Sequence, residues 1–363
     1  MKIAFVTPAY HPAIMGASLY CQGLAKHLLK NGIEVTIYTN ATPDMVKEET
    51  VEGIHVKRFY PKIFGRYYIS SGMFSSVIKG SLDLIHSHHY GYYPATAGFV
   101  AAKLRKVPHV FGPYYHPPLY GIRSMVMTEM YHVTQGLPLI RFSDKVLPHT
   151  KFERGLLIGA GGDPDKMELL PNIVDTKLFS PMGKKEKIVL FVSTLMSEKG
   201  ANIALNIAED ITSKREDVRF VFIGRINEEG IKEKVKQLSK NKKIKFLSNL
   251  SVTDLIKWYR RSMIFILPSR YEAFARVIAE AEACGAAVVS TRVGGVPEVV
   301  INKKTGFLVD YGDWEGMKER IEYLLDHTSK TVSFGKKGRL HVVKNFDTQT
   351  VGNKLIKIYE DLL

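Results

Sequence analysis

Short apolar runs alternate with longer amphipathic stretches along almost all of this 363-residue chain. This alternation predicts β-α units that build parallel sheets. In the first half, the predicted strands are residues 3–8, 34–39, 55–59, 84–88, 109–112, 145–148 and 168–170. In the second half they are residues 187–192, 218–223, 244–247, 263–267, 287–290 and 306–309. Helical periodicity fills most gaps, as in Ser18–Lys30. The pattern therefore predicts an α/β protein with two sheets in tandem.

A polar, turn-rich segment separates the two series of strands. It runs from Leu170 to Lys185 and contains two prolines and a glycine, which is typical of a linker between domains. We place the boundary near residue 180, with one Rossmann-like domain at 1–180 and a second at 181–345. The remaining stretch, 346–363, carries apolar residues at helical spacing, so another part of the chain must cover it.

Composition indicates a packed globular protein. The chain is 45% hydrophobic and 24% charged, which excludes a largely disordered protein. Met1 and Lys2 lead directly into the first strand, a start too short and too polar for a signal peptide. No apolar run approaches the roughly 18–20 residues that span a bilayer, so we expect a cytoplasmic protein. Cys21 and Cys284 lie in apolar, helix-like segments and are interpreted as core residues rather than as a disulfide or a nucleophile.

The net charge of +15 favours anionic partners, namely nucleic acid, an anionic membrane or phosphorylated ligands. Between Lys57 and Lys145, eleven basic residues stand against three acidic ones, with aromatic residues interleaved. Such a surface could bind lipid head groups or surround an anionic acceptor. It could also be a solvated basic face above core aromatics. No nucleic-acid reader motif is present, so we do not expect nucleic-acid binding.

The most specific segment runs from Pro268 to Thr291. A predicted strand leads into a short loop and then a helix from about Phe274, which places the loop at the carboxyl end of a parallel strand, where such sheets bind ligands. A helix N-terminus can bind a diphosphate. Glu280 lies roughly 9 Å into the helix at 1.5 Å per residue, so it could accept hydrogen bonds from a ribose while Glu272 faces a sugar. Both could instead be ordinary surface carboxylates.

This segment resembles the E-x7-E region of the family-4 retaining glycosyltransferases. The likeness includes the Pro-Ser before Glu272 and the Ala-Cys-Gly and Val-Val that follow Glu280. It continues through Gly294–Glu298, Thr305–Val309, Leu170–Asn172, Val174-Asp175, Asn345-Phe346 and Ile358–Glu360. The resemblance implies a GT-B fold: two Rossmann-like domains face a central cleft, and the last helix crosses back onto the first domain.

The resemblance also implies the residues that bind a sugar-nucleotide donor. Lys199, between a strand and a helix, matches a lysine that binds the donor diphosphate, and a cation there can stabilise the leaving group. Thr194 stands where relatives usually carry an arginine, and Arg276 or Arg270 could supply that charge. Further donor contacts are expected from Gly16, Phe274, Ala275, Arg276 and Glu280.

The first domain is expected to bind the acceptor. His116 matches the second histidine of a Pro-His-x-His segment and is expected to act in catalysis and acceptor binding, while Tyr114 replaces the first histidine. His88, at the end of a predicted strand, is the third expected acceptor contact. Met15 replaces the first of two glycines that relatives carry before the first helix, and Gly16 keeps the second.

We expect no metal site. His86, His88 and His89 lack the cysteine or carboxylate ligands that usually complete a zinc site. Asp163 and Asp165 fit a D-x-D pattern, but they follow two glycines and are interpreted as a turn. No cofactor is expected beyond the nucleotide-diphosphate sugar itself, which is a co-substrate.

The resulting hypothesis is a metal-independent, retaining hexosyltransferase that uses a nucleotide sugar. Glu272 would orient the sugar and Lys199 would stabilise the departing diphosphate, so no protein nucleophile is needed. The acceptor is expected to be a lipid-linked or cell-surface glycan, and a peripheral position of the enzyme on the inner membrane face would suit such an acceptor. The alternative is a non-catalytic relative that binds a sugar nucleotide or glycan, because alanines at 273 and 275 replace glycines that relatives usually carry.

Overall fold

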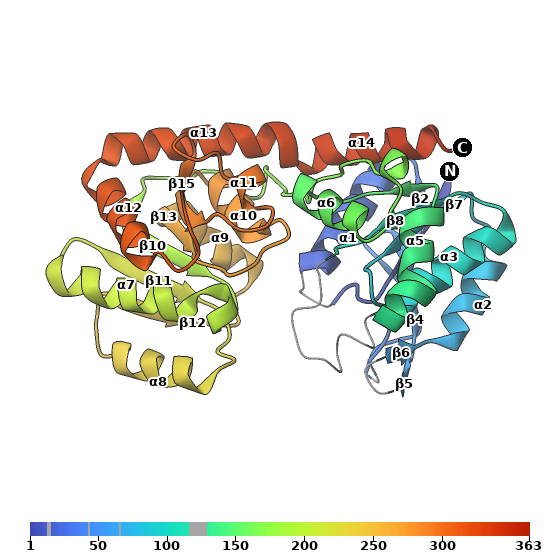
Figure 1. The fold of residues 1–363 in the computed structure, drawn as a ribbon, viewed down its shortest axis with the longest axis horizontal. Helices are drawn as coiled ribbons and strands as arrows, with labels where there is room; N and C mark the ends of the chain where they lie inside the picture. The colour runs from blue at the N-terminus through green and yellow to red at the C-terminus, as the bar shows by residue number, and fades with distance from the viewer. Residues whose placement is uncertain (13–15, 43, 65–66, 116–128) are drawn as a thin grey trace. The chain divides into compact units, whose positions relative to one another are not determined.

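Two parallel sheets, one in each half of the chain, dominate the computed structural model (Figure 1). It describes residues 1–12, 16–42, 44–64, 67–115 and 129–363. The chain divides into two compact units. Unit 1 comprises Met1–Ile173 and Thr348–Leu363, and unit 2 comprises Val174–Asp347. The division thus falls between Ile173 and Val174, whereas the sequence placed a boundary near residue 180.

Unit 1 contains the first sheet, a small β-hairpin and the helices around them. In chain order its elements are β1 (Lys2–Thr7), α1 (Gly16–Lys30), β2 (Glu34–Asn40), β3 (Glu48–Val51), β4 (Ile54–Phe59), β5 (Lys62–Phe64), β6 (Tyr67–Ile69), α2 (Ser71–Lys79), β7 (Leu84–His88), α3 (Tyr93–Arg105), β8 (His109–Gly112), a π-helical turn (His132–Gly136), α5 (Leu137–Phe142), β9 (Lys145–Val146), α6 (Lys151–Gly159), a 3₁₀ turn (Pro164–Lys166) and α14 (Thr348–Glu360).

Unit 2 contains the second sheet. Its elements are β10 (Glu186–Val192), a 3₁₀ turn (Ser197–Lys199), α7 (Ala201–Lys214), β11 (Arg219–Ile223), α8 (Glu229–Leu238), β12 (Ile244–Leu247), α9 (Val252–Arg261), β13 (Ser262–Leu267), α10 (Arg276–Ala283), β14 (Ala287–Thr291), α11 (Val296–Val299), β15 (Gly306–Val309), α12 (Trp314–Asp326) and α13 (Thr328–Phe346).

Both sheets have the crossover topology that β-α units produce. Among the described residues, the first sheet has the order β3-β4-β2-β1-β7-β8-β9, and only β3 runs antiparallel to its neighbour. The second has the order β12-β11-β10-β13-β14-β15, with every pair parallel. In each sheet the chain order reverses beside the first strand, which is where open α/β sheets bind ligands.

The last helix belongs to unit 1. Val351, Leu355, Ile358 and Tyr359 on α14 are buried in the same core as α1. The two helices approach closely, because a Cβ at Gly352 would lie 2.3 Å from the ring of His27. The Tyr359 hydroxyl also shares a hydrogen bond of 2.6 Å with His86 Nδ1. The apolar stripe seen in the sequence is therefore covered by the first unit, as the resemblance implied.

The strand predictions fail at a few places with clear causes. Residues 168–170 do not form a strand, although the N–H groups of Glu168 and Leu170 donate to the carbonyls of Val146 and Pro148. Pro148 has no N–H to donate in return, so the ladder cannot continue. The strands β3, β5 and β6 were missed because they have only four, three and three residues, too few to form a recognisable pattern. The predicted helix 346–363 is α14, which begins at Thr348 after α13 has ended at Phe346.

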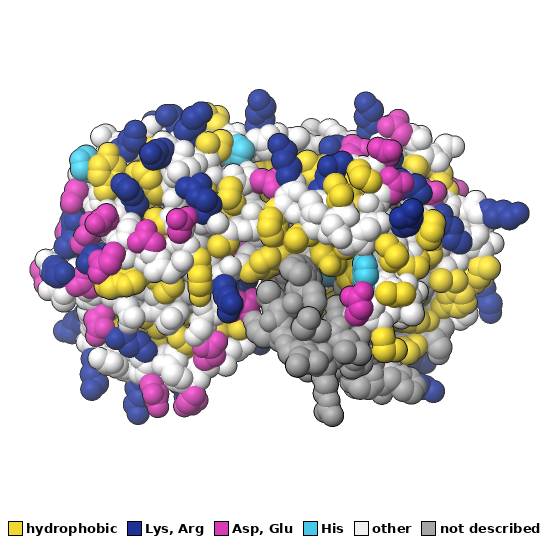
Figure 2. Space-filling view, in the orientation of Figure 1, with side chains coloured by type: hydrophobic (Ala, Val, Ile, Leu, Met, Phe, Trp, Pro, Cys, Tyr) yellow, Lys and Arg dark blue, Asp and Glu magenta, His cyan; other side chains and the backbone are white. Residues whose placement is uncertain are grey.

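Charged side chains of both signs are interspersed over the visible face of unit 2 (Figure 2). Within the described residues, no helix combines the length and hydrophobicity that crossing a membrane requires.

Cys21 and Cys284 are both buried and unpaired, which confirms that they are core residues.

Candidate active site

The loop between β13 and α10 holds the backbone in an unusual conformation. The helix starts at Arg276, two residues later than predicted, because Ala275 adopts a left-handed conformation with φ 63° and ψ 61°. Alanine in this region costs roughly 1–2 kcal/mol. No side chain caps the first turn. A strained residue at a helix start on the carboxyl edge of a sheet is typical of functional sites.

Glu280 lies inside unit 2 rather than on its surface. It is only 6% exposed and accepts hydrogen bonds from Arg276 Nε at 2.9 Å and from the Tyr259 hydroxyl at 3.1 Å. Burial raises the pKa of Glu280, while Arg276 and the Tyr259 hydroxyl oppose that shift. The reading of Glu280 as an ordinary surface carboxylate is therefore wrong. Arg276 balances the negative charge of the Glu280 carboxylate, so the Arg276 charge is already paired.

Lys199 and Glu272 form an ion pair at the same edge of the sheet. Lys199 Nζ lies 2.8 Å from Glu272 Oε1, which also accepts a hydrogen bond from Ser269 Oγ at 2.9 Å. Their side chains are 27% and 14% exposed. The structure thus brings together two residues that the sequence singled out separately, one after β10 and the other after β13.

Two glycines bring the backbone close to this pair. Gly200 has φ +72°, and a Cβ there would lie 2.1 Å from the carbonyl oxygen of Pro268. Gly294 has φ +51°, and a Cβ there would lie 1.9 Å from the carbonyl oxygen of Glu272. Only glycine combines these angles with these approaches. The loops after β10, β13 and β14 therefore meet around Lys199 and Glu272.

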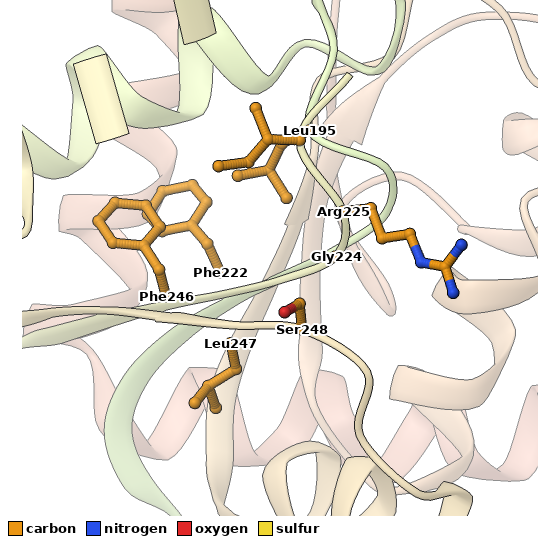
Figure 3. Close-up of a pocket in the computed structure, with 8 residues that line it drawn as sticks. Leu195, Phe222, Gly224, Arg225, Phe246, Leu247 and Ser248 are labelled. Atoms are coloured by element: carbon orange, nitrogen blue, oxygen red, sulfur yellow. The ribbon is translucent and has the colours of Figure 1, made fainter. Parts of the chain in front are cut away.

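An open cavity of about 290 Å³ lies beside these loops (Figure 3). Its lining comes from the carboxyl ends of β11 and β12 and from the loops after β10, β11 and β12: Leu195, Phe222, Gly224, Arg225, Ile226, Phe246, Leu247 and Ser248. In Figure 3 the Arg225 side chain extends away from the apolar group formed by Leu195, Phe222 and Phe246. The sequence analysis missed this cavity, although Gly224 directly after a strand was a signal that could have indicated it.

Other predicted donor residues lie in different surroundings. Phe274 is 4% exposed, and its ring packs edge-on against Phe346 at 5.1 Å, so the side chain serves the core of unit 2. Thr194 is partly exposed in the loop after β10. Gly16 is the first residue of α1, and a Cβ there would meet nothing within 4 Å. Met15 and His116 lie outside the described residues.

His88 and Tyr114, the two predicted acceptor residues that the structure describes, have buried polar groups. His88 is fully buried, and neither ring nitrogen has a hydrogen-bond partner among the described residues. Burial, reinforced by nearby histidines, holds the pKa of His88 well below its usual range, so the ring is neutral. The Tyr114 hydroxyl is also buried, and burial raises its pKa. Both polar groups are therefore enclosed in this structure, and their expected role in acceptor binding stays a prediction.

Tyr114 nevertheless belongs to a strained loop. Its φ is +49°, and its ring stacks at 4.2 Å on His89, whose φ is +73°. Left-handed conformations at two contacting non-glycine residues are costly, and such residues cluster at functional sites. The carboxyl edge of the first sheet therefore resembles that of the second in storing strain.

The described part of the chain contains no cluster of three or more His, Cys, Asp or Glu residues that could hold a metal ion. Asp163 caps the 3₁₀ turn instead, accepting a hydrogen bond from Asp165 N at 3.1 Å. This confirms that the D-x-D pattern is a structural turn.

Comparison with known proteins covers nearly the whole chain. The family profile described as "Glycosyltransferase Family 4" matches residues 14–178, and the profile described as "Glycosyl transferases group 1" matches residues 176–341. A glycosyltransferase of Methanocaldococcus jannaschii is 24% identical over 97% of this chain and 96% of its own length. Spore coat protein SA of Bacillus subtilis is 25% identical, with 99% of each chain covered.

Solved structures show the same fold. HepE of Anabaena in complex with UDP superposes with a TM-score of 0.79 at 18% identity, over 100% of both chains. Sucrose-phosphate synthase of Thermosynechococcus elongatus superposes with a TM-score of 0.78 at 19% identity, covering 99% of this chain and 98% of the other.

Proposed function

This chain belongs to the family-4 glycosyltransferases of GT-B fold, and on that basis we propose that it transfers a sugar from a nucleotide-diphosphate donor to a glycan or lipid-linked acceptor with retention of configuration. The observation that carries the proposal is the Lys199–Glu272 ion pair at the carboxyl edge of the second sheet. Relatives solved with UDP, with UDP-glucose and with ADP support a nucleotide donor.

The geometry supports distinct roles for the two residues. Lys199 is partly exposed on a turn, so its ammonium group can contact a diphosphate and stabilise the charge that builds as the glycosidic bond breaks. Glu272 is held by Ser269 and by Lys199, and its carboxylate can accept hydrogen bonds from sugar hydroxyls. Neither role needs a protein nucleophile, in keeping with attack by the acceptor on the face that the diphosphate leaves.

Glu280 can hold the ribose only by sharing its carboxylate. Both of its oxygens already accept hydrogen bonds, one from Arg276 and the other from Tyr259. A carboxylate oxygen has two lone pairs, so each can accept a further hydroxyl donor. We therefore keep Glu280 as a ribose contact and assign Arg276 to the support of Glu280.

The test is a panel of UDP-, GDP- and ADP-sugars, screened first for binding and then for transfer to membrane extracts and free glycans. We expect one nucleotide class to bind and its diphosphate to be released only when an acceptor is present. Binding without acceptor-dependent release would instead support the non-catalytic alternative. The anomeric configuration of the product, read by NMR, tests retention, and turnover in EDTA tests metal independence.

We also propose that unit 1 docks on an anionic membrane through the outer face of α3 and α5. Thr96 on α3 donates a hydrogen bond at 2.8 Å to Gln135, in the π-helical turn that leads into α5. Large apolar side chains are exposed on and beside them: Val100, Leu104, Met130, Val133 and Phe142. Hydrophobic side chains are visible over this region in Figure 2, with Lys and Arg at its margin. Apolar residues beside basic ones suit the lipid interface.

Sedimentation with vesicles tests this surface. We expect binding to vesicles rich in phosphatidylglycerol and little binding to pure phosphatidylcholine. Leu104→Ser should weaken binding, whereas Leu340→Ser, a change on α13 at a residue of similar exposure, should not. Equal loss in both variants, or no binding by the wild type, would exclude the α3–α5 surface as a docking site.

A further inference from the structure

The charged groups around Lys199 and Glu272 cancel one another. Lys199 is paired with Glu272 at 2.8 Å, and Arg276 is paired with Glu280 at 2.9 Å. These four side chains therefore present no net charge to a ligand. A diphosphate carries negative charge on both phosphates, so a site that binds it needs a cation beyond these pairs.

Arg225 is a cation without a carboxylate partner at this edge. Among the described residues, its guanidinium makes one hydrogen bond, from Nε to Asn249 Oδ1 at 3.2 Å, and no ion pair within 4.0 Å. It is exposed and lines the open cavity (Figure 3). Asn249 has a left-handed backbone with φ 54°. An exposed arginine that lacks a carboxylate partner among the described residues can bind an anionic ligand.

The backbone fixes Arg225 beside the loop that leads to Lys199. Leu195 N donates to Arg225 O at 2.8 Å, and Asn227 N donates to Leu195 O at 3.2 Å. Gly224 permits this approach, because a Cβ there would lie 1.8 Å from the carbonyl oxygen of Ser193. Thr194 lies between Ser193 and Leu195, the two residues that make these contacts, and it carries no charge. Backbone hydrogen bonds at the edge of the sheet therefore fix the position of the Arg225 backbone.

We propose that Arg225 supplies the positive charge that, together with Lys199, binds the diphosphate of the donor. This inference rests on the proposed function, because it assigns a further residue to the same donor site. Arg276 is excluded from that role, since withdrawing it would leave Glu280 buried beside only a tyrosine. Arg270 is the competing candidate, because its N–H donates to the Glu198 carbonyl next to Lys199 at 2.9 Å.

Calorimetric titration with inorganic pyrophosphate, UDP, GDP and ADP, and with the matching nucleosides, tests the assignment. In Arg225→Ala we expect the affinity for pyrophosphate and for the preferred nucleotide to fall about tenfold, the usual weight of a charge-assisted contact. Affinity for the nucleoside should not change. Arg219→Ala, at the opposite end of β11, is the matched control and should bind as the wild type does.

The remaining outcomes overturn the assignment of Arg225, the proposed function, or both. Unchanged pyrophosphate affinity in Arg225→Ala with a loss in Arg270→Ala would transfer the role to Arg270. An equal loss of nucleoside affinity would place Arg225 at the base or ribose. If the wild type binds pyrophosphate but no nucleotide, the anion site stands and the proposed function fails. If it binds neither, both fail. Melting temperatures of all variants check that each remains folded.

Discussion

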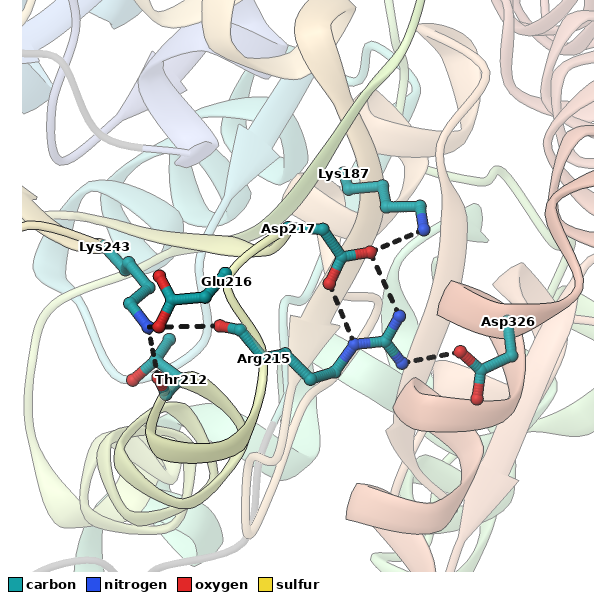
Figure 4. A network of polar contacts seen from close by, with 7 residues as sticks. All are labelled: Lys187, Thr212, Arg215, Glu216, Asp217, Lys243 and Asp326. Atoms are coloured by element: carbon teal, nitrogen blue, oxygen red, sulfur yellow. Dashed lines mark hydrogen bonds and ion pairs between the residues drawn. The ribbon is translucent and has the colours of Figure 1, made fainter.

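At the amino ends of β10 and β11 every charge shown in Figure 4 has an opposite partner, whereas at the carboxyl ends of the same strands Arg225 has no ion-pair partner among the described residues. Arg215 contacts Asp217 at 3.1 Å and Asp326 at 2.6 Å, and Lys187 contacts Asp217 at 2.6 Å. Hydrogen bonding by Arg215, aided by Lys187, holds the pKa of Asp217 well below its usual range. This edge of the sheet is built for stability.

The carboxyl edge contains features that lower the stability of the folded state. Ala275 is left-handed, and the backbone approaches at Gly224 and Gly294 exclude any side chain. Destabilising features of this kind are typical of functional sites, where they position groups that contact a ligand. The comparison indicates that unit 2 is stabilised from one end of its sheet and used from the other, and the following experiments test that division from the largest expected effect to the smallest.

The largest effect concerns Glu282 on α10, which is fully buried. Burial raises its pKa to about 8, against a smaller opposing effect of Thr305. The folded state therefore keeps a proton that the unfolded chain releases, and the free energy of unfolding should fall as pH rises from 5 to 8, by up to about 4 kcal/mol. Glu282→Gln should remove this dependence in urea titrations at both pH values. An unchanged slope, or the same change in the exposed control Glu319→Gln, would contradict the assignment.

The next effect tests the close approach at the site. Gly294→Ala would place a Cβ 1.9 Å from the Glu272 carbonyl at a positive φ, and should lower the free energy of unfolding by about 3 kcal/mol. Gly312→Ala is the matched control, since its φ is +94° but a Cβ would meet nothing within 4 Å. Comparing the unfolding free energies of both variants separates the cost of the positive φ from the cost of the steric contact with Glu272. Equal losses would show that the approach to Glu272 is unimportant.

Lys199→Ala tests the active edge through turnover. Loss of the cation beside Glu272 should reduce turnover at least tenfold, about 1.4 kcal/mol in the barrier, once a donor and acceptor are known. The exposed Lys232, which pairs only with Glu229, provides the control for substitution of a lysine. Normal turnover in Lys199→Ala would remove this residue from the mechanism.

Arg215→Ala tests the stabilising edge. Removing its contacts with Asp217 and Asp326 should cost about 1 kcal/mol, because partly exposed ion pairs contribute little individually. Donor affinity should remain that of the wild type. A loss of binding with intact stability would reverse the division between the two edges.

The smallest effect is a gain. Ala275→Gly relieves the left-handed alanine but adds freedom to the unfolded chain, so we expect a net stabilisation of about 0.5 kcal/mol. Differential scanning calorimetry can resolve it against Ala283→Gly, a change within the same helix that should destabilise. Destabilisation by Ala275→Gly would show that Ala275 carries no strain.

The sequence predicted the repeated β-α pattern because buried parallel strands are continuous apolar runs. It also singled out Lys199 and Glu272, although 73 positions separate them, because each follows a predicted strand and because both match positions of the glycosyltransferase pattern that the chain resembles. The four-residue spacing of Arg276 and Glu280 allows an ion pair on one helix face, but the sequence does not show that Glu280 is buried beside Tyr259. Nor could it show that His88 is enclosed, because a strand pattern does not say what covers its last residue.

The return of α14 to unit 1 has a consequence for biosynthesis. Tyr359 and Leu355 complete the core around α1, yet they are translated after all of residues 174–347. The first unit therefore leaves the ribosome with its α1 face uncovered and must wait for the second to be made. The core of the first unit can therefore be completed only after the second unit has been synthesised.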